Sequence, residues 1–533
     1  MRTPWTNFII PLFCLLYFIF ELCYTQYAAI GPDEFWFAHH IYQYQHSLPY
    51  RDFSPYKTVL GYYILLIPML FSHALLTPLL YIKNTIAAMN AIGLFVACLW
   101  LRRYFSLSAI IMAFLLLVFS QLFLGYSTDI RVDLLAYWCC LFSALCLFDK
   151  RFIFAGILIA LGFLISQKAL WYIVASNTAL LFSRHRLKDI IKFNTALIIV
   201  LSIYIAAWSI ASSLHTVLNS VFHEAFLMYQ LDAYSMYRRI YWTITITNNP
   251  LLFLLFPLTI IALSKERLFI FIYAWTILAL LILYKQVFPY YMIVIFPAFL
   301  FLYTEFFDKL LQQRFSLSAS SMIIILFFAS SYLMKLPANN NHYQKSMLMV
   351  TNKLLNDKSD YLAGIDYFYD RNQPIAGMQL LDLPALNYLY HPTPSLRNMM
   401  FASLNRAPDL TIEKAIENIK QSHIKLYVNN YRIEQLPPAI KHYLSSEYEH
   451  FTGSIYLYAP TISSVYTHIK FTGIYQVEST QVVFMDGKKM NPHTFIHLIA
   501  GTHLSQNRFP YRLRYIPQDI VIQGYLPDLW QYM

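Results

Sequence analysis

The sequence predicts a polytopic α-helical membrane protein, with about eleven spanning helices, an interfacial helix and a C-terminal outward-facing α/β or α+β domain. Two observations predict this class. The 533 residues are 58% hydrophobic and only 13% charged, whereas a soluble chain carries about 25% charged residues. Apolar segments follow one another up to about residue 335, and the rest of the chain is polar and mixed. We therefore divide the chain into a membrane domain, 1–335, and a domain outside the membrane, 336–533.

The spanning helices are predicted from the apolar segments, since a helix needs about 20 apolar residues to cross a bilayer. Residues 5–29 lack the small-residue cleavage site of a signal peptide, so we expect a retained first helix. The candidate spans lie approximately at 6–28, 84–101, 106–125, 134–148, 152–166, 169–183, 190–212, 250–264, 268–284, 290–306 and 319–335.

One further apolar segment, 59–81, is ambiguous, and charge decides its interpretation. If it does not cross, the basic clusters fall on the same side as the N-terminus, as the positive-inside rule requires. Pro68 and Pro78 also suit a helix that lies in the interface. We therefore predict that the N-terminus is cytoplasmic and the C-terminus outside. The clusters concerned are Arg102-Arg103, Lys150-Arg151, Arg184-His185-Arg186, Lys265-Arg267 and Lys309.

The net charge of +11 has the same explanation. Membrane proteins gather Lys and Arg in cytoplasmic loops, so no nucleic-acid partner is expected. The six cysteines all lie in apolar segments, and we interpret them as small buried hydrophobes, not as disulfides or a zinc site. The short C-terminal domain has no cysteine, which favours a bacterial inner membrane with this domain in the periplasm.

The C-terminal domain shows alternating helical and strand patterns. "TIEKAIENIKQSHI" and "LPPAIKHYLSSEY" have helical patterns, the first behind a threonine cap. "KLYVNNYRI" and "SIYLYAP" are typical of short strands, and "VVFMDGKKM" predicts a hairpin around its Asp-Gly turn. No phosphate loop, metal-ligand spacing or catalytic triad is present in the domain.

Polar segments converge on the predicted outer face. They are an opening loop after the first helix, a loop at 125–133 and a longer loop at 213–249, with shorter polar stretches at 166–168 and 284–291. Ionisable groups at membrane depth are costly and usually mark a substrate pathway.

The opening loop places two carboxylates, Asp33 and Glu34, and the lysine Lys57 beside membrane-embedded sequence. A carboxylate near a low-dielectric surface can serve as a general base. A lysine there can hold an anionic leaving group such as a phosphate. A solvated loop whose charges reach water is the alternative.

The other outer segments add further candidates, each with a structural alternative. Arg131 and Asp133 precede a spanning helix, where the helix dipole alone would favour the carboxylate. His223 could contact a substrate or pack at the interface. Lys285 and Tyr290 could bind substrate or form an ordinary flank with an aromatic belt.

Taken as a set, these motifs resemble the polytopic GT-C glycosyltransferases, in the branch of the protein O-mannosyltransferases and the bacterial lipid A aminoarabinose transferases. The resemblance covers about residues 1–335. It includes the Asp-Glu pair, "SLPYRDF", "YKTVLGYY", "RVDLLAYW" and "KQVFPYYMIVIFPAF". The family pattern Lys-Pro-Pro-Leu keeps Lys57 and Leu60 here, whereas Thr58 and Val59 replace both prolines.

The resemblance implies transfer of a sugar from a polyprenyl-phosphate-linked donor to a glycan, lipid or protein acceptor on the outer face of the membrane. It implies Asp33 as the base, with Glu34 and Asp133 positioning donor or acceptor. Lys57 would bind the phosphate.

Further contacts would come from Arg131, His223, Lys285 and Tyr290. No cofactor or metal is required by this chemistry, although a divalent cation could bind the carboxylates. A lipid or solute transporter is the alternative class, and a membrane-assembly component is a third. Against transport, the chain shows no internal repeat and its charges lie at one face.

Overall fold

The structure is a computed structural model of the 533-residue chain. It describes residues 6–55, 57–72, 76–183, 186–224, 226, 238–263, 267–284, 288–313, 341–355, 361–363, 367–370, 412–434 and 436–516. Two compact units are present. The helical unit comprises Met1–Ala28 and Ile41–Ala338, and the second unit comprises Ala29–His40 and Asn339–Met533.

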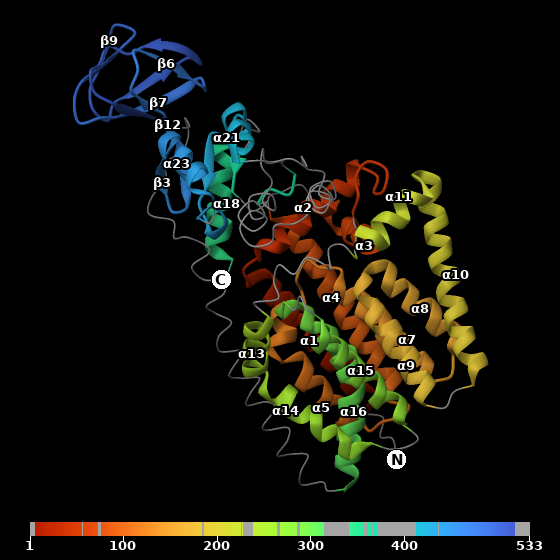
Figure 1. Ribbon diagram of the computed structural model, residues 1–533. Helices are drawn as coiled ribbons and strands as arrows, with labels where there is room; N and C mark the ends of the chain where they lie inside the picture. The colour runs from red at the N-terminus through yellow and green to blue at the C-terminus, as the bar shows by residue number, and fades with distance from the viewer. Residues whose placement is uncertain are drawn as a thin grey trace. The chain divides into compact units, whose positions relative to one another are not determined.

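The helical unit is a bundle of apolar helices (Figure 1). Helix α1 packs on α4, α7 on α8, α8 on α10, α9 on α15 and α5 on α16. The bounds are α1 Thr6–Tyr27, α3 Leu60–Met69, α4 Thr77–Leu101, α5 Leu107–Val118, α6 Gln121–Tyr126, α7 Asp133–Phe148, α8 Phe152–Ile165, η1 Gln167–Ala169, α9 Leu170–Phe182, α10 Leu187–Ala211, α11 Leu214–Leu218, η2 Asn219–Glu224, α13 Arg238–Asn248, α14 Pro250–Leu258, η4 Thr259–Ala262, α15 Leu268–Leu283, η6 Pro289–Ile295 and α16 Phe296–Gln313. Helix α2, Pro32–His46, runs across the division between the units.

Among the described residues, four helices are long and apolar enough to cross a membrane, and the bent pair α13–α14 would be a fifth. Five shorter apolar helices have 10 to 17 residues. The chain is thus a polytopic α-helical membrane protein with a separate C-terminal unit, as the sequence predicts. The number of eleven spans stays a prediction, and the candidate span at 319–335 lies outside the described residues.

The prediction of one continuous interfacial segment over 59–81 is wrong in its second half. Helix α3 ends at Met69, and α4 begins at Thr77 and continues to Leu101. Pro78 lies in the first turn of α4, where its fixed φ and missing N–H favour a helix start. The ten residues of α3 cover about 15 Å, half the thickness of a bilayer core.

Three other predictions at the level of elements need correction. The span at 106–125 is broken between α5 and α6, because Ser120 has an extended backbone and caps α6 by accepting from Phe123 N. The opening loop contains α2, whose first turn holds both carboxylates. The predicted loop 213–249 contains α11, the π-helix η2 and α13.

Ionic groups collect at both ends of α7. Asp149 follows its last residue and accepts from Trp100 Nε1 at 3.0 Å and from the Tyr104 hydroxyl. Arg103 and Arg151 lie 3.9 and 4.0 Å from the same carboxylate. Two basic clusters of the predicted cytoplasmic side therefore meet at one end of α7, about 24 Å along the helix from its first residue.

The six cysteines form no disulfide. Four are buried, as the sequence predicts for small hydrophobes, whereas Cys139 is half-buried and Cys23 is exposed. Cys23 lies on α1, the first spanning helix.

Within its described residues, the second unit combines helices with two four-stranded sheets and two two-stranded sheets. The strand orders are β1-β2-β4-β3, β10-β7-β12-β5, β11-β6 and β8-β9; the β1·β2 pair is parallel and the others are antiparallel. The bounds are α18 His342–Leu354, β1 Tyr361–Leu362, α21 Ile412–Gln421, β2 Leu426–Val428, α22 Tyr431–Glu434, α23 Pro438–Glu447, β3 Tyr448–Thr452, β4 Ile455–Tyr458, β5 Thr461–Ile462, β6 Tyr466–Ile469, β7 Gly473–Glu478, β8 Val483–Met485, β9 Lys488–Met490, β10 Phe495–Leu498, β11 Gly501–Leu504 and β12 Tyr511–Ile516.

Both predicted helices of this unit are confirmed, as are the hairpin and the strand in "SIYLYAP". Of "KLYVNNYRI" only Leu426–Val428 is a strand, whereas Tyr431–Glu434 forms helix α22. Asp486 and Gly487 have φ values of 52° and 74°, as a turn between β8 and β9 needs. The other strands after residue 460 were not predicted, although Tyr511–Tyr515 of β12 does alternate between apolar and polar residues.

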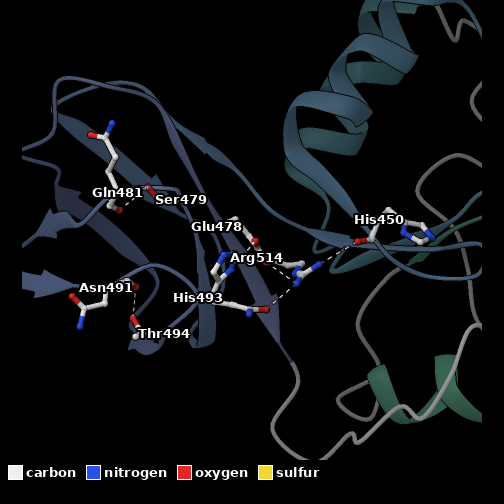
Figure 2. A network of polar contacts seen from close by, with 9 residues as sticks. His450, Glu478, Ser479, Gln481, Asn491, His493, Thr494 and Arg514 are labelled. Carbon is white, nitrogen blue, oxygen red and sulfur yellow. Dashed lines mark hydrogen bonds and ion pairs between the residues drawn. The ribbon is translucent and has the colours of Figure 1, made fainter.

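An arginine connects the two large sheets of the second unit. Figure 2 shows Arg514 of β12 between Glu478 of β7 and the backbone at His450 of β3. Its guanidinium lies 2.6 Å from the Glu478 carboxylate and donates to the His450 carbonyl at 3.2 Å. One buried apolar core, which includes Leu444, Tyr475 and Leu513, runs beneath both sheets.

Candidate active site

Lys57 lies in the segment between α2 and α3. The residue is half-buried, and its ammonium group donates to the Tyr62 hydroxyl at 2.8 Å. The next residue is fixed to α8, since the Thr58 hydroxyl donates to the Phe163 carbonyl at 2.8 Å. Removal from water lowers the pKa of Lys57 to about 7, with Asp133 acting in the opposite direction.

Asp133 is the first residue of α7, where the helix dipole favours a negative charge. Helix α8 ends at Ile165, and the turn η1 that follows brings Ser166 and Lys168 to this carboxylate. The Ser166 hydroxyl donates to Asp133 at 2.7 Å, and Lys168 forms an ion pair with it. Burial lowers the pKa of Lys168 to about 8, and the pairing with Asp133 opposes that shift.

Two tyrosines of η6 lie against the cations. The Arg131 guanidinium is 3.6 Å from the centre of the Tyr290 ring, and the Lys168 ammonium is 3.8 Å from that of Tyr291. Cations within about 6 Å of a ring face are attracted to it, more strongly where water is excluded. Arg131 also lies 3.5 Å from Asp129.

The start of α3 packs directly on this group. A Cβ atom on Gly61 would lie 2.7 Å from Val132 Cβ and 2.9 Å from the Ile165 carbonyl. Only a residue without a side chain permits that approach. The contact places the Lys57 segment beside the residues that flank Asp133.

Lys57, Arg131, Asp133 and Lys168 act on one another electrostatically. With Asp129 included, three cations face two carboxylates, and the balance is positive. We define Lys57, Asp129, Arg131, Asp133 and Lys168 as the cationic cluster. A positively charged, partly desolvated cluster of this kind is suited to an anion such as a phosphate.

Asp33 and Glu34 belong to the second unit. Glu34 is buried, and its carboxylate accepts from the Gly31 N–H at 2.7 Å, at the start of α2. Asp33 is half-buried in the same first turn. Helix-end stabilisation therefore accounts for part of why two carboxylates stand here. Their participation with Lys57 in one site stays a prediction.

Two other predicted site residues, His223 and Lys285, are not among the members of the cationic cluster defined above. His223 is exposed on η2, and its neighbour Glu224 accepts from Asn219 at 3.0 Å and from the Ser54 hydroxyl. Lys285 lies outside the described residues. Among the residues that the structure does describe, no group of three or more His, Cys, Asp or Glu could hold a metal ion.

Sequence reasoning missed Lys168 in the cationic cluster and a buried carboxylate, Glu21, elsewhere in the helical unit. Lys168 is not among the residues predicted from the sequence, although its "SQK" stretch is a polar break between apolar segments. Glu21 was missed inside α1. It is fully buried, accepts from the Tyr17 hydroxyl and lies 3.4 Å from Asn90 Nδ2. A carboxylate within an apolar span was the available signal.

Comparison with known proteins gives a likeness among solved structures. No protein-family model and no curated protein matches the chain. Among solved structures, the chain is similar to ArnT from Cupriavidus metallidurans bound to undecaprenyl phosphate, with 15% sequence identity and a TM-score of 0.47. The likeness covers 67% of this chain and 73% of that one. An identity this low does not carry substrates from one protein to another, so they must be argued from this chain's own residues.

Proposed function

We propose that the protein is a membrane glycosyltransferase that transfers a sugar from a polyprenyl-phosphate-linked donor to an acceptor on the outer face of the membrane. The acceptor is a glycan, lipid or protein hydroxyl or amine. The motif resemblance supports the reaction class, and the observation that carries the proposal is the cationic cluster at the end of the apolar helices.

The chemistry explains why such a cluster is needed. The bond between the anomeric carbon and the phosphate oxygen breaks, and its electron pair stays on the lipid phosphate. The acceptor atom forms a new bond to the anomeric carbon and loses its proton to a base. Cations placed where the negative charge grows stabilise the transition state.

The residues divide between these tasks. Lys57 binds the phosphate, and Arg131 and Lys168 add positive charge on the same side. Asp133 holds Lys168 in place through their ion pair. The η6 tyrosines confine both neighbouring cations. Asp33 is the proposed base and Glu34 its neighbour, on the strength of the motif resemblance. No cofactor is needed, because the lipid monophosphate departs onto residues of the chain itself.

The test is sugar release from a radiolabelled polyprenyl-phosphate donor by purified protein in lipid nanodiscs. We expect Lys57→Met to weaken donor binding and turnover together, because the lysine contacts phosphate before and during departure. Asp33→Asn should lower turnover by roughly 100-fold or more with donor binding little changed.

Glu34→Gln is the matched control for the base. A larger loss with Glu34→Gln than with Asp33→Asn would exchange their roles. If the wild-type protein carried the intact labelled donor across vesicle membranes without cleaving it, the protein would be a transporter and the proposal would be wrong.

A further inference from the structure

Tyr50 has an unusual backbone that the fold holds at several points. Its φ is 65°, in the left-handed region that residues with a side chain rarely adopt. Its N–H donates to the Phe53 carbonyl at 2.8 Å, and its carbonyl accepts from the Ser212 hydroxyl at 2.5 Å. The ring is only 2% exposed and lies edge-on to Trp208, 5.4 Å between centres. Strain of this kind persists only where the surroundings impose it.

The Tyr50 hydroxyl begins a directed chain of hydrogen bonds. It donates to the Lys57 carbonyl at 2.7 Å and lies 2.8 Å from the hydroxyl of Tyr204 on α10. A hydroxyl has one proton, so the proton between the two tyrosines belongs to Tyr204. The Tyr204 oxygen in turn accepts from the Val59 N–H at 3.0 Å.

The two ends of this chain meet the backbone on either side of Thr58. Every donor and acceptor in it has a partner, from the Val59 N–H through both hydroxyls to the Lys57 carbonyl. The Thr58 side chain is bonded to α8 at the same time. The segment that carries Lys57 is therefore held from α8 and from α10.

Val59 could not be a proline in this arrangement. Its φ is −118°, whereas proline is restricted to about −65° and has no N–H to donate. The hydroxyls of Tyr50 and Tyr204 thus hold the backbone at residues 57–59, where the family pattern Lys-Pro-Pro-Leu has two prolines.

We infer that Tyr50 and Tyr204 are positioning residues that hold the Lys57 ammonium group at the cationic cluster, where the donor phosphate binds. The role in donor binding rests on the proposed function, whereas the hold on Lys57 does not. The two claims can therefore be tested apart.

In the first measurement, the intact, full-length protein in nanodiscs is labelled by reductive methylation across a pH series. Mass spectrometry then gives the extent of labelling at Lys57 and at a reference lysine. Exposed Lys489 is the internal reference. In Tyr204→Phe the Val59 N–H loses its acceptor, and we expect the pH midpoint of Lys57 labelling to rise by about one unit towards that of Lys489. Tyr50→Phe should move it in the same direction, and it tests the same claim if the Tyr204 variant does not fold.

Tyr63→Phe is the matched control. Tyr63 lies in the same aromatic group, stacked on Trp208 with 6.1 Å between ring centres. None of the described residues is hydrogen-bonded to its hydroxyl, so its loss should leave the midpoint of Lys57 in place. An unchanged midpoint in both Tyr50→Phe and Tyr204→Phe, or an equal change in Tyr63→Phe, would overturn the inference.

The second measurement is the affinity for undecaprenyl phosphate alone. We expect Kd to rise about tenfold in Tyr204→Phe, with KM for the donor raised more than kcat is lowered. A purely structural role would instead lower the apparent kcat and the number of binding sites in proportion to the folded fraction, and would leave KM and Kd unchanged. If Lys57 labelling shifts as expected but the wild-type protein neither binds the lipid nor transfers sugar, the positioning of Lys57 stands and the proposed function fails.

Discussion

Lys57 combines burial with a role that requires charge. Because its pKa is lowered to about 7, the ammonium form is present below pH 7 and is lost as the pH rises through that value. We expect the affinity for undecaprenyl phosphate to fall roughly tenfold between pH 6 and pH 8. Equilibrium binding to protein in nanodiscs at a series of pH values measures this.

Lys57→Arg is the control for that pH dependence, since a guanidinium stays charged throughout. The arginine variant should show only the titration of the lipid phosphate and of Lys168, whose pKa is lowered to about 8. A wild-type curve that coincides with the arginine curve would contradict a titrating Lys57.

The Asp133–Lys168 pair makes a second prediction. Removing one partner of a buried pair leaves the other charge uncompensated, at a cost of about 3 kcal/mol or more. Asp133→Asn should therefore lower the apparent Tm markedly. Asp133→Asn combined with Lys168→Gln should recover part of that loss, because the stranded cation is gone. Thermal unfolding of the four proteins forms a double-mutant cycle, and simply additive losses would show that the pair is not coupled.

Helix α3 has only ten residues and packs very closely against its neighbours. Gly61→Ala would place a methyl group 2.7 Å from Val132 Cβ and 2.9 Å from the Ile165 carbonyl. Overpacking of this kind costs about 1–3 kcal/mol, and displacement of α3 should also weaken donor binding.

The matched control for Gly61→Ala is Ile67→Ala in the same helix, where the side chain is 59% exposed. Thermal unfolding and undecaprenyl phosphate binding are measured for both variants. A Gly61→Ala protein that equals wild type in both would mean that the close approach of α3 is not required.

At the scale of the whole molecule, the predicted orientation in the membrane can be tested directly. The Asp149 end of α7 carries Arg103 and Arg151, so we expect it in the cytoplasm, with the cationic cluster outside. A cytoplasm-active reporter should work when fused after Lys150. It should be inactive after Leu76 and after Met533. Activity after Leu76 would mean that the α3 segment crosses, and activity after Met533 would place the second unit inside.

The sequence was sufficient for the fold class, because apolar length and charge placement are recorded directly in the residues. It also identified three members of the cationic cluster site: Lys57, Arg131 and Asp133. It could not identify Lys168 as the partner of Asp133, because η1 brings that lysine back only once α8 has ended at Ile165. Helix breaks at single residues, such as Ser120, were also hidden within continuous apolar sequence.

The hydrogen-bonded hold on residues 57–59 has a consequence for how related sequences can differ. A chain that acquires proline at position 59 gives up the N–H that Tyr204 accepts, and the Tyr204 hydroxyl then keeps only its hydrogen bond to Tyr50. Descendants of a common ancestor should therefore keep either a hydroxyl at 204 with a non-proline at 59, or proline at 59 with a less constrained residue at 204. Intermediates that have neither should be rare, so the two positions are expected to covary although they lie 145 positions apart in the sequence.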